Sequence, residues 1–188
     1  MKSERKLITH MIFFSFSIGQ WRFKEFSLDL TISQDFLKVT YTAGCDGDHA
    51  AFGGKFDPRN KELQRFSVRI LRLRKTGFQS IGAIFDETGK FPMNKAGILG
   101  RVDSWCITVK NTTLFLRGEE KTKLTENIKE GTVISVVLNV HRNLLTFEIN
   151  GDEVHSEVEI QLKKKELQCL KPFIKLCYLG DALEIVDY

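Results

Sequence analysis

The sequence lacks the features that mark several large classes of protein. Its 188 residues include only three prolines and four cysteines, and no Cys-x-x-Cys pair. It has no uninterrupted apolar run of the roughly 20 residues that a membrane-spanning helix needs. Basic and acidic residues nearly balance, 28 against 24, which does not by itself imply nucleic acid. The densest basic run, from Lys61 to Lys75, includes Arg72 and Arg74 on one face; a phosphate-contacting patch is conceivable, but we interpret the run as a solvated strand face. We therefore expect neither nucleic acid nor a membrane as a partner.

The motifs of cofactor binding and catalysis are also missing. Gly53-Gly54 stands alone, so there is no glycine-rich phosphate loop. No Gly-x-Ser-x-Gly sequence occurs, the four histidines are scattered, and the acidic residues near Glu148 do not form a pair. We therefore predict that the chain is not an enzyme and binds no cofactor.

One short cluster has the residue types of a metal site. Cys45, Asp46, Asp48 and His49 lie within five residues, but the spaced oxygen ligands of a calcium loop and a second Cys or His pair are missing. We interpret the cluster as a polar turn and predict no metal. Cys106 and Cys177 lie in apolar, strand-like runs, which favours buried free thiols.

The N-terminus has two possible interpretations. Basic residues followed by the apolar run Leu7 to Ile18 resemble a signal peptide, but polar residues interrupt the run and no small-x-small cleavage site follows. Ile12, Phe14, Phe16 and Ile18 alternate with their neighbours, which is typical of a strand. We predict that residues 1–25 form an N-terminal strand or extension and that the protein is cytoplasmic, with secretion as the alternative.

The stretch from Gly131 to Gly151 has the clearest pattern in the chain. Apolar residues alternate with others from Ile134 to Val140, and again from Leu145 to Ile149, with a polar corner over residues 141–143. This is the period of a strand with one buried face. Asn150-Gly151 supplies two residues that tolerate positive φ, as a type I′ turn requires. The stretch predicts two buried strands and the turn into a third.

Other segments extend this picture. Alternation over Phe26–Ile32 and Leu37–Tyr41 predicts a hairpin, and a change of phase at Leu71 predicts a β-bulge. Gly82, in a short apolar strand, predicts close approach of a neighbouring chain or ring. Residues 43–60 and 86–99 are expected to be long loops, 119–123 a charged turn, and 163–170 one helical turn or a loop.

Convincing helices of ten or more residues are absent, whereas short strands with turn signals recur along the chain. The 15 phenylalanines also suit the inner layer of a packed two-sheet structure. We predict a single all-β domain over residues 1–188, built as a sandwich of two antiparallel sheets.

The same residues resemble a known family. Gly131-Thr132-Val133-Ile134, Leu138-Asn139-Val140 and Leu145-Thr146-Phe147-Glu148-Ile149-Asn150-Gly151 are similar to the C-terminal half of a SPRY domain, although Thr132 and Asn139 replace usual aspartates. Leu170 to Phe173 and Leu183 to Ile185 resemble its closing strands. Gly100 to Trp105 resembles the segment before a middle strand. The match is good over about residues 60–188.

The resemblance implies a concanavalin-like sandwich that binds a peptide or a partner protein through loops at one rim. SPRY domains often serve as substrate receptors in ubiquitin ligases. A lectin-like sandwich that binds carbohydrate is the alternative, and we assume a monomer. Trp105 has a second interpretation as a core residue. Carried onto this sequence, the candidate partner-binding residues are Asp46, Asp48, His49, Phe91, Pro92, Met93, Asp103, Trp105, Tyr178 and Asp181.

Overall fold

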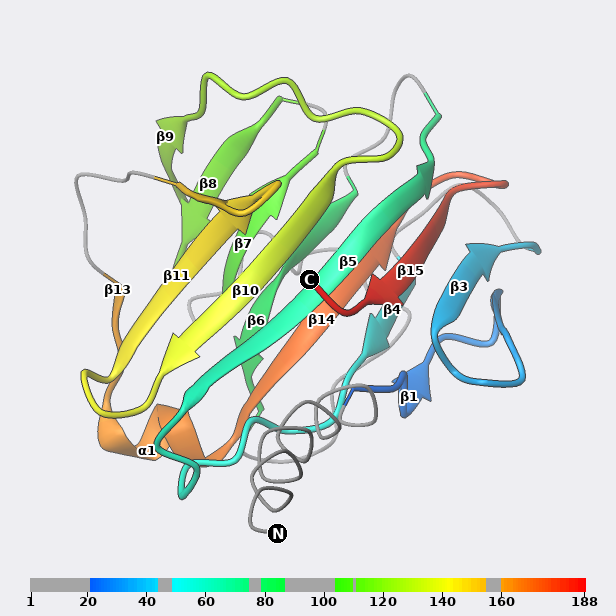
Figure 1. Ribbon diagram of the computed structural model, residues 1–188. Helices are drawn as coiled ribbons and strands as arrows, with labels where there is room; N and C mark the ends of the chain where they lie inside the picture. Colours follow the sequence, from blue (N-terminus) through cyan, green and yellow to red (C-terminus); the bar gives the residue numbers. More distant parts are fainter. Residues whose placement is uncertain (1–20, 44–48, 75–78, 87–103, 110, 155–159) are drawn as a thin grey trace, which may run out of the picture.

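The computed structural model describes residues 21–43, 49–74, 79–86, 104–109, 111–154 and 160–188. Two antiparallel sheets contain nearly all of its regular structure (Figure 1). The strand predicted within residues 1–20 lies outside the described residues. In the part of the chain that is described, no helix is long and apolar enough to span a bilayer.

One sheet has seven strands and the other has eight. The seven-stranded sheet has the order β1 (Glu25–Phe26), β4 (His49–Phe52), β14 (Leu170–Leu176), β6 (Ser80–Phe85), β7 (Ser104–Thr108), β8 (Thr113–Leu116) and β9 (Glu119–Lys123). The eight-stranded sheet has the order β12 (Asp152–Glu153), β11 (Leu144–Ile149), β10 (Val133–Asn139), β5 (Leu63–Arg72), β15 (Ala182–Val186), β3 (Lys38–Tyr41) and β2 (Leu30–Ile32), and β13 (Ile160–Gln161) pairs with β11.

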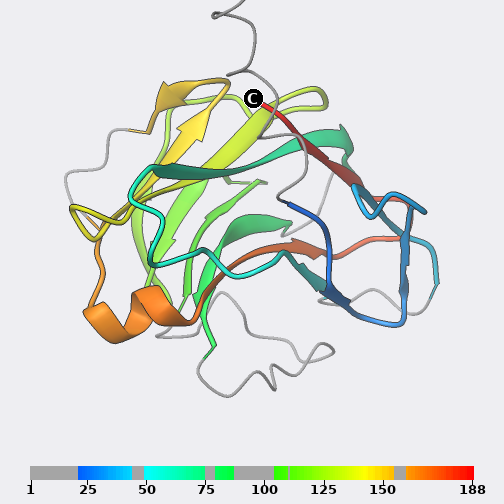
Figure 2. The same cartoon turned by 60° about the horizontal axis from the view of Figure 1, so that its bottom comes forward.

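The two sheets stack as layers around one core, which confirms the predicted sandwich (Figure 2). Phe66, Val68 and Ile70 of β5 are completely buried, as are Ile81 and Ala83 of β6. This is the alternation expected when the inner faces of two sheets interdigitate. Burial of apolar surface between the sheets is therefore the main force that holds the layers together.

The stretch from Gly131 to Gly151 folds as predicted. β10 pairs with β11, and Ile149 lies opposite Asp152 across the turn into β12. Asn150 and Gly151 have φ of 53° and 91°, in agreement with the type I′ turn. The Asn150 side chain also accepts a hydrogen bond from the Val133 N–H at 3.0 Å, so this turn is fixed to the start of β10.

Two further local predictions are confirmed. Ala182 of β15 lies opposite Arg72, whereas Leu183 lies opposite Ile70, so Leu71 is the extra residue of a bulge. A Cβ on Gly82 would lie 2.1 Å from the Trp105 carbonyl oxygen and 2.5 Å from Cys106 Cβ. Only glycine therefore lets β6 approach β7 this closely.

The predicted strand over Phe26–Ile32 is wrong in its continuity. The chain passes from one sheet to the other within it: β1 pairs with β4, and β2 pairs with β3 in the second sheet. Leu28, at the crossing, exposes 92% of its surface instead of facing the core. The hairpin of β2 and β3 is otherwise as expected, with Ile32 opposite Val39.

Two segments predicted as loops or turns are strands. His49–Phe52, inside the expected loop over residues 43–60, forms β4, which is buried and pairs with both β1 and β14. Glu119–Lys123, expected to be a charged turn, forms β9 at the edge of its sheet. Because only β8 lies beside it, β9 keeps its charged side chains in water.

α1 (Lys164–Gln168) is the single helix of the described chain and confirms the helical turn expected over residues 163–170. It precedes β14 and marks one end of the sandwich, which we call the α1 end (Figure 1). β5 and β14 finish at the opposite end, where β15 begins after Asp181. We call this the Asp181 end.

Candidate functional site

Of the predicted partner-binding residues that the structure describes, Trp105 lies in β7 and the other three lie at the Asp181 end. β6 and β14 are antiparallel neighbours, with Leu170 opposite Phe85 and Lys175 opposite Ser80. The segments that follow them therefore leave the sandwich at opposite ends. Tyr178 and Asp181 lie at the Asp181 end together with His49, whereas Phe85 and Ser104 face the α1 end. Asp46, Asp48, Phe91, Pro92, Met93 and Asp103 lie outside the described residues.

Trp105 is a core residue. It exposes 1% of its surface and lies within the main apolar cluster between the sheets. The Arg117 guanidinium lies 5.0 Å from the centre of its ring, and Arg117 Nη1 in turn forms an ion pair of 2.9 Å with Glu166 of α1. The second interpretation of Trp105 therefore applies, because a side chain buried this completely offers no contact area to a partner.

Asp181 organises the Asp181 end from inside, since its exposed fraction is 0%. Its Oδ2 accepts hydrogen bonds from Gln79 Nε2 at 2.6 Å and from the Tyr178 N–H at 3.0 Å. Its Oδ1 accepts from the Arg74 N–H at 2.9 Å. A buried carboxylate is stable only when such donors surround it. Asp181 thus holds the ends of β5 and β14 together but does not itself face a partner.

His49 is also buried, and its Nδ1 lies 3.1 Å from both Ser27 Oγ and Asp29 Oδ2. These are the residue types of a catalytic triad, but the arrangement differs. In a triad, the serine contacts one nitrogen of the imidazole, which takes its proton, and the acid accepts a hydrogen bond from the other nitrogen. Here both contact the same nitrogen. The contacts fasten the crossing between β1 and β2 to the first residue of β4.

The exposed groups at the Asp181 end surround the turn from Tyr178 to Asp181. Tyr178 is half-buried and Leu179 exposes 52% of its surface. Gly180 has φ of 91°, in the left-handed region. The Gly180 N–H donates to the Tyr41 carbonyl, and the Tyr41 N–H donates to the Asp181 carbonyl. The exposed Leu28 lies on the segment next to β3, because the Thr42 N–H donates to the Asp29 carbonyl.

Arg72 and Arg74 border the same turn, and sequence reasoning placed them only on a solvated strand face. A Cβ on Gly180 would lie 3.7 Å from Arg74 Nε and Nη2 and 3.9 Å from Arg72 Nη1. Both side chains are exposed. The alternation beyond Leu71 indicated that they share a face, but their proximity to Gly180 depends on pairing across the sheet.

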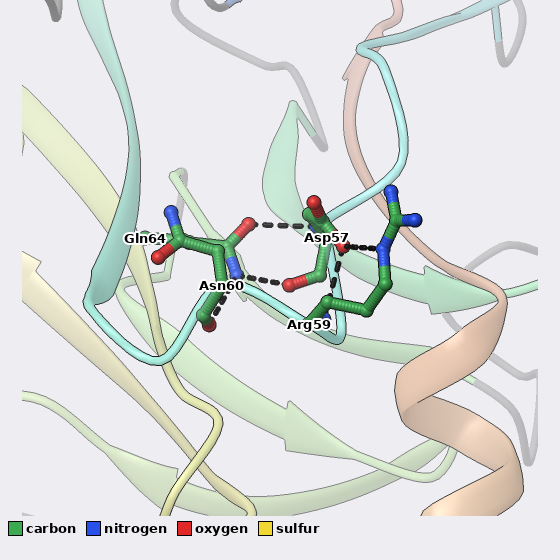
Figure 3. Close-up of polar contacts among 4 residues, drawn as sticks. All are labelled: Asp57, Arg59, Asn60 and Gln64. Carbon is green, nitrogen blue, oxygen red and sulfur yellow. Dashed lines mark hydrogen bonds and ion pairs between the residues drawn. The ribbon is translucent and has the colours of Figure 1, made fainter.

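The α1 end is built differently. A network of short-range hydrogen bonds holds the loop that connects β4 to β5 (Figure 3). Gln64 is buried; its Oε1 accepts from the Asp57 N–H at 2.7 Å, and its Nε2 donates to the Asp57 carbonyl at 2.6 Å. Asp57 Oδ1 also accepts from the Arg59 N–H at 2.9 Å, and the Asn60 N–H donates to the Asp57 carbonyl. These bonds close the loop on itself, so few of its polar groups are left for a ligand.

A buried ion-pair cluster also lies towards the α1 end. Lys171 Nζ lies 2.8 Å from Glu25 Oε1 and 3.3 Å from Asp86 Oδ2. Burial by itself lowers the pKa of Lys171, but the hydrogen bonds and charges of Glu25 and Asp86 outweigh it and raise the pKa above its ordinary value. The three residues connect β1, β14 and the end of β6, which is a structural role.

A cavity of about 350 Å³ opens beside the last residues of the chain. Its walls come from Trp21 and Leu37, from the start of β5, and from the segment after β15. Arg65, in this wall, already pairs with Glu148 at 2.7 Å. Among the described residues, no group of three or more His, Cys, Asp or Glu side chains is placed to hold a metal ion.

Comparison of the sequence with protein-family models gives no match, and neither does comparison with curated proteins. Comparison of the structure does. The SPRY domain of human HERC1 is similar with a TM-score of 0.64 and 16% identity, over 87% of this chain and 98% of that one. A human SPRY domain gives 0.68 and 14%, over 86% and 96%.

The PSpry domain of TRIM65 gives a TM-score of 0.63 and 11% identity, over 90% of each chain. The agreement extends over both sheets in all three comparisons, since at least 86% of this chain is covered. It confirms the resemblance that the sequence shows over about residues 60–188. The chain has the fold of a SPRY domain.

Proposed function

We propose that this domain is a non-catalytic protein-interaction module that binds a peptide or partner surface through its Asp181 end. The observation that carries the proposal is the exposed apolar surface there, on Leu28 and Leu179, in segments that hydrogen bonds hold in place. Binding residues are commonly placed on turns that a rigid scaffold fixes, and a pre-ordered turn loses little entropy when a partner binds. The three similar solved structures described above are SPRY domains, which favours protein binding over the carbohydrate alternative.

A capture experiment with matched variants tests the choice of end. Leu179→Asp changes an exposed leucine at the Asp181 end, and Leu63→Asp changes one at the α1 end that exposes 62% of its surface. Both add one negative charge to a wet position, so both variants should fold. We expect proteins captured from cell extract by the wild type to be lost with Leu179→Asp and kept with Leu63→Asp. Equal retention by both variants, or the reverse pattern, would contradict the proposal.

The proposal includes a role as the substrate receptor or adaptor of a ubiquitin-ligase assembly, as the resemblance implies. Such a role requires that a captured protein be modified because it is bound. We expect ubiquitination of that protein in cells to fall with Leu179→Asp and to persist with Leu63→Asp. If binding is lost while ubiquitination is unchanged, the receptor role is wrong although the binding role stands.

A further inference from the structure

Arg72 and Arg74 form a pair of guanidinium groups that converge on one point of the Asp181 end. Both lie within 4 Å of the position that a Cβ on Gly180 would occupy, and glycine leaves that position empty. Four of the described arginines have acidic partners: Arg59 pairs with Asp57, Arg65 with Glu148, Arg69 with Glu184, and Arg117 with Glu166. No described carboxylate pairs with Arg72 or Arg74 in this way.

The bulge at Leu71 explains why the pair faces outward. Phe66, Val68 and Ile70 point into the core, and regular alternation would point Arg72 there as well. The extra residue reverses the phase, so Arg72 and Arg74 become exposed while Leu73 packs against the core. A bulge at the end of a strand is a common means of re-aiming side chains towards a binding site.

The buried carboxylate of Asp181 fixes the pair relative to the turn. It accepts the Arg74 N–H and the Tyr178 N–H, so the backbone that carries the arginine and the backbone that carries Leu179 are tied to the same side chain. Its own oxygens are buried and accept hydrogen bonds from these N–H groups and from Gln79 Nε2. The Glu130 carboxylate lies nearby, since its Oε1 accepts the Leu73 N–H at 3.0 Å, but among the described residues it forms no ion pair with either guanidinium.

From this geometry we infer that the Asp181 end selects an acidic peptide: an Asp or Glu carboxylate bound between Arg72 and Arg74, with a neighbouring apolar side chain on Leu179. Arginine is suited to this role because its planar fork binds a carboxylate through two parallel hydrogen bonds. The missing side chain of Gly180 leaves room for the peptide to approach. The inference rests on the proposed function and names the chemistry of its ligand.

Selection from a random peptide library displayed on phage tests the inference, with the whole domain as bait. We expect peptides selected by the wild type to be enriched in Asp or Glu at a fixed spacing from an apolar residue. A selected peptide should bind Arg72→Gln/Arg74→Gln at least tenfold more weakly, and its affinity should fall as NaCl is raised from 50 to 300 mM. Replacing the acidic residue of the peptide by Gln or Asn should produce a similar loss.

The matched control is Lys164→Gln/Lys165→Gln, which removes the same two charges from exposed positions of α1 at the opposite end. It should bind as the wild type does. Equal losses in both double variants would show a general charge effect and overturn the inference. Selected peptides without acidic enrichment that lose binding with Leu179→Asp would overturn the acidic preference but retain the proposed function. Failure to select any peptide would count against both.

Discussion

Gly82 lies where two neighbouring strands come closest, and its replacement by alanine tests that packing. The added Cβ would lie 2.1 Å from a backbone oxygen of β7. A backbone atom cannot move aside by changing rotamer, as a side chain can. Because this overpacks a rigid part of the core, we expect Gly82→Ala to lower the free energy of unfolding by about 3 kcal/mol. Urea denaturation measures the change.

Gly54→Ala is the control for this substitution. A Cβ at Gly54 would lie 3.4 Å from Lys24 Nζ, the far end of a flexible side chain. Its effect should stay within about 0.5 kcal/mol. Equal effects at the two positions would show that the cost belongs to glycine replacement in general and not to the contact between β6 and β7.

Cys106 couples stability to alkaline pH. Burial raises the pKa of its thiol to about 12, and the nearby charge of Lys175 opposes this only partly. The folded state therefore keeps the proton while the unfolded chain releases it near pH 9, so the stabilising contribution is present below pH 9 and is lost as pH rises towards 12. We expect stability to fall by up to about 1.4 kcal/mol per pH unit in that window because of this one group.

Cys106→Ala isolates the effect, because other groups titrate in the same range and remain in both proteins. Urea unfolding of the wild type and the variant at pH 7.5, 9 and 10.5 should give a stability difference that narrows or reverses as pH rises. Parallel pH dependences of the two proteins would contradict the assignment. The same burial should protect Cys106 from alkylation until the protein unfolds.

Single residues were predictable from sequence where a local pattern determines their environment. The closeness at Gly82 and the burial of Cys106 follow from the apolar strands that contain them. The roles of Trp105 and Asp181 do not, because a tryptophan beside a loop and an aspartate after a turn are equally compatible with a surface. Their burial depends on partners more than 10 residues away, such as Arg117 and Gln79.

At the scale of the element, the bulge in β5 makes an unusual prediction about deletions. Removing Leu71 converts the bulge into a regular strand, because Ile70 and Arg72 already lie opposite consecutive residues of β15. The inward residues before it and Leu73 after it keep their faces. We expect the deletion of Leu71 to leave the protein folded, at a cost of about 1–3 kcal/mol from lost packing, and to leave Arg72 and Arg74 on their present face.

Deletion of Arg69 in the same strand is the contrasting case. It leaves no extra residue to absorb the change, so every side chain on one side of the deletion turns to the opposite face. Circular dichroism and thermal denaturation of the two deletion variants should show a folded protein for Leu71 and an unfolded or aggregated one for Arg69. Loss of the fold in both would contradict the prediction that removal of Leu71 restores a regular strand.

The elements that sequence patterns missed are the ones that do not alternate in the usual way. β4 is four residues long and buried throughout, so it shows no period of two and lies among turn-forming residues. β9 lies at an edge of its sheet and is charged. A solvent-exposed edge strand with consecutive charged residues has the same sequence pattern as a loop. By contrast, β10 and β11 have strongly alternating sequences, and their turn is dictated by Asn150-Gly151.

For the whole molecule, the topology predicts one cooperative unfolding transition. β5 pairs with β10 and with β15, and β14 pairs with β4, so neither sheet can form from one continuous segment. Trp21 packs against Phe56 and Phe66, 5.0 and 5.6 Å between ring centres, while Trp105 lies in β7. Fluorescence and far-ultraviolet circular dichroism should give one common midpoint in urea.

Refolding should be slow for a domain of this size, on the order of milliseconds to seconds, because most strand pairs are distant in sequence.

In the urea experiment, the variant Trp21→Phe leaves Trp105 as the fluorescence reporter and should give the same midpoint by fluorescence and by circular dichroism. Separate midpoints for the two signals would mean that the sheets unfold independently, against the topology.

The arrangement of the two rims was beyond the reach of sequence reasoning for a geometric reason. Which end of the sandwich a loop occupies depends on the direction of the strand that precedes it, and direction depends on which strands are neighbours. Tyr178 follows β14 and Asp86 follows β6, and only the pairing of those strands reveals that they finish at opposite ends of the sandwich. Fold class could therefore be predicted from periodicity, whereas the composition of the candidate site required coordinates.

The outermost strands of the two sheets are brief. β1 and β12 have two residues each, β2 has three, and β9, the longest of the four, has five and is charged at four of them. Such short or charged edge strands offer another copy of the chain few unpaired backbone groups for strand pairing and little continuous apolar surface. Concentrated solutions of the protein should therefore resist the formation of fibrils.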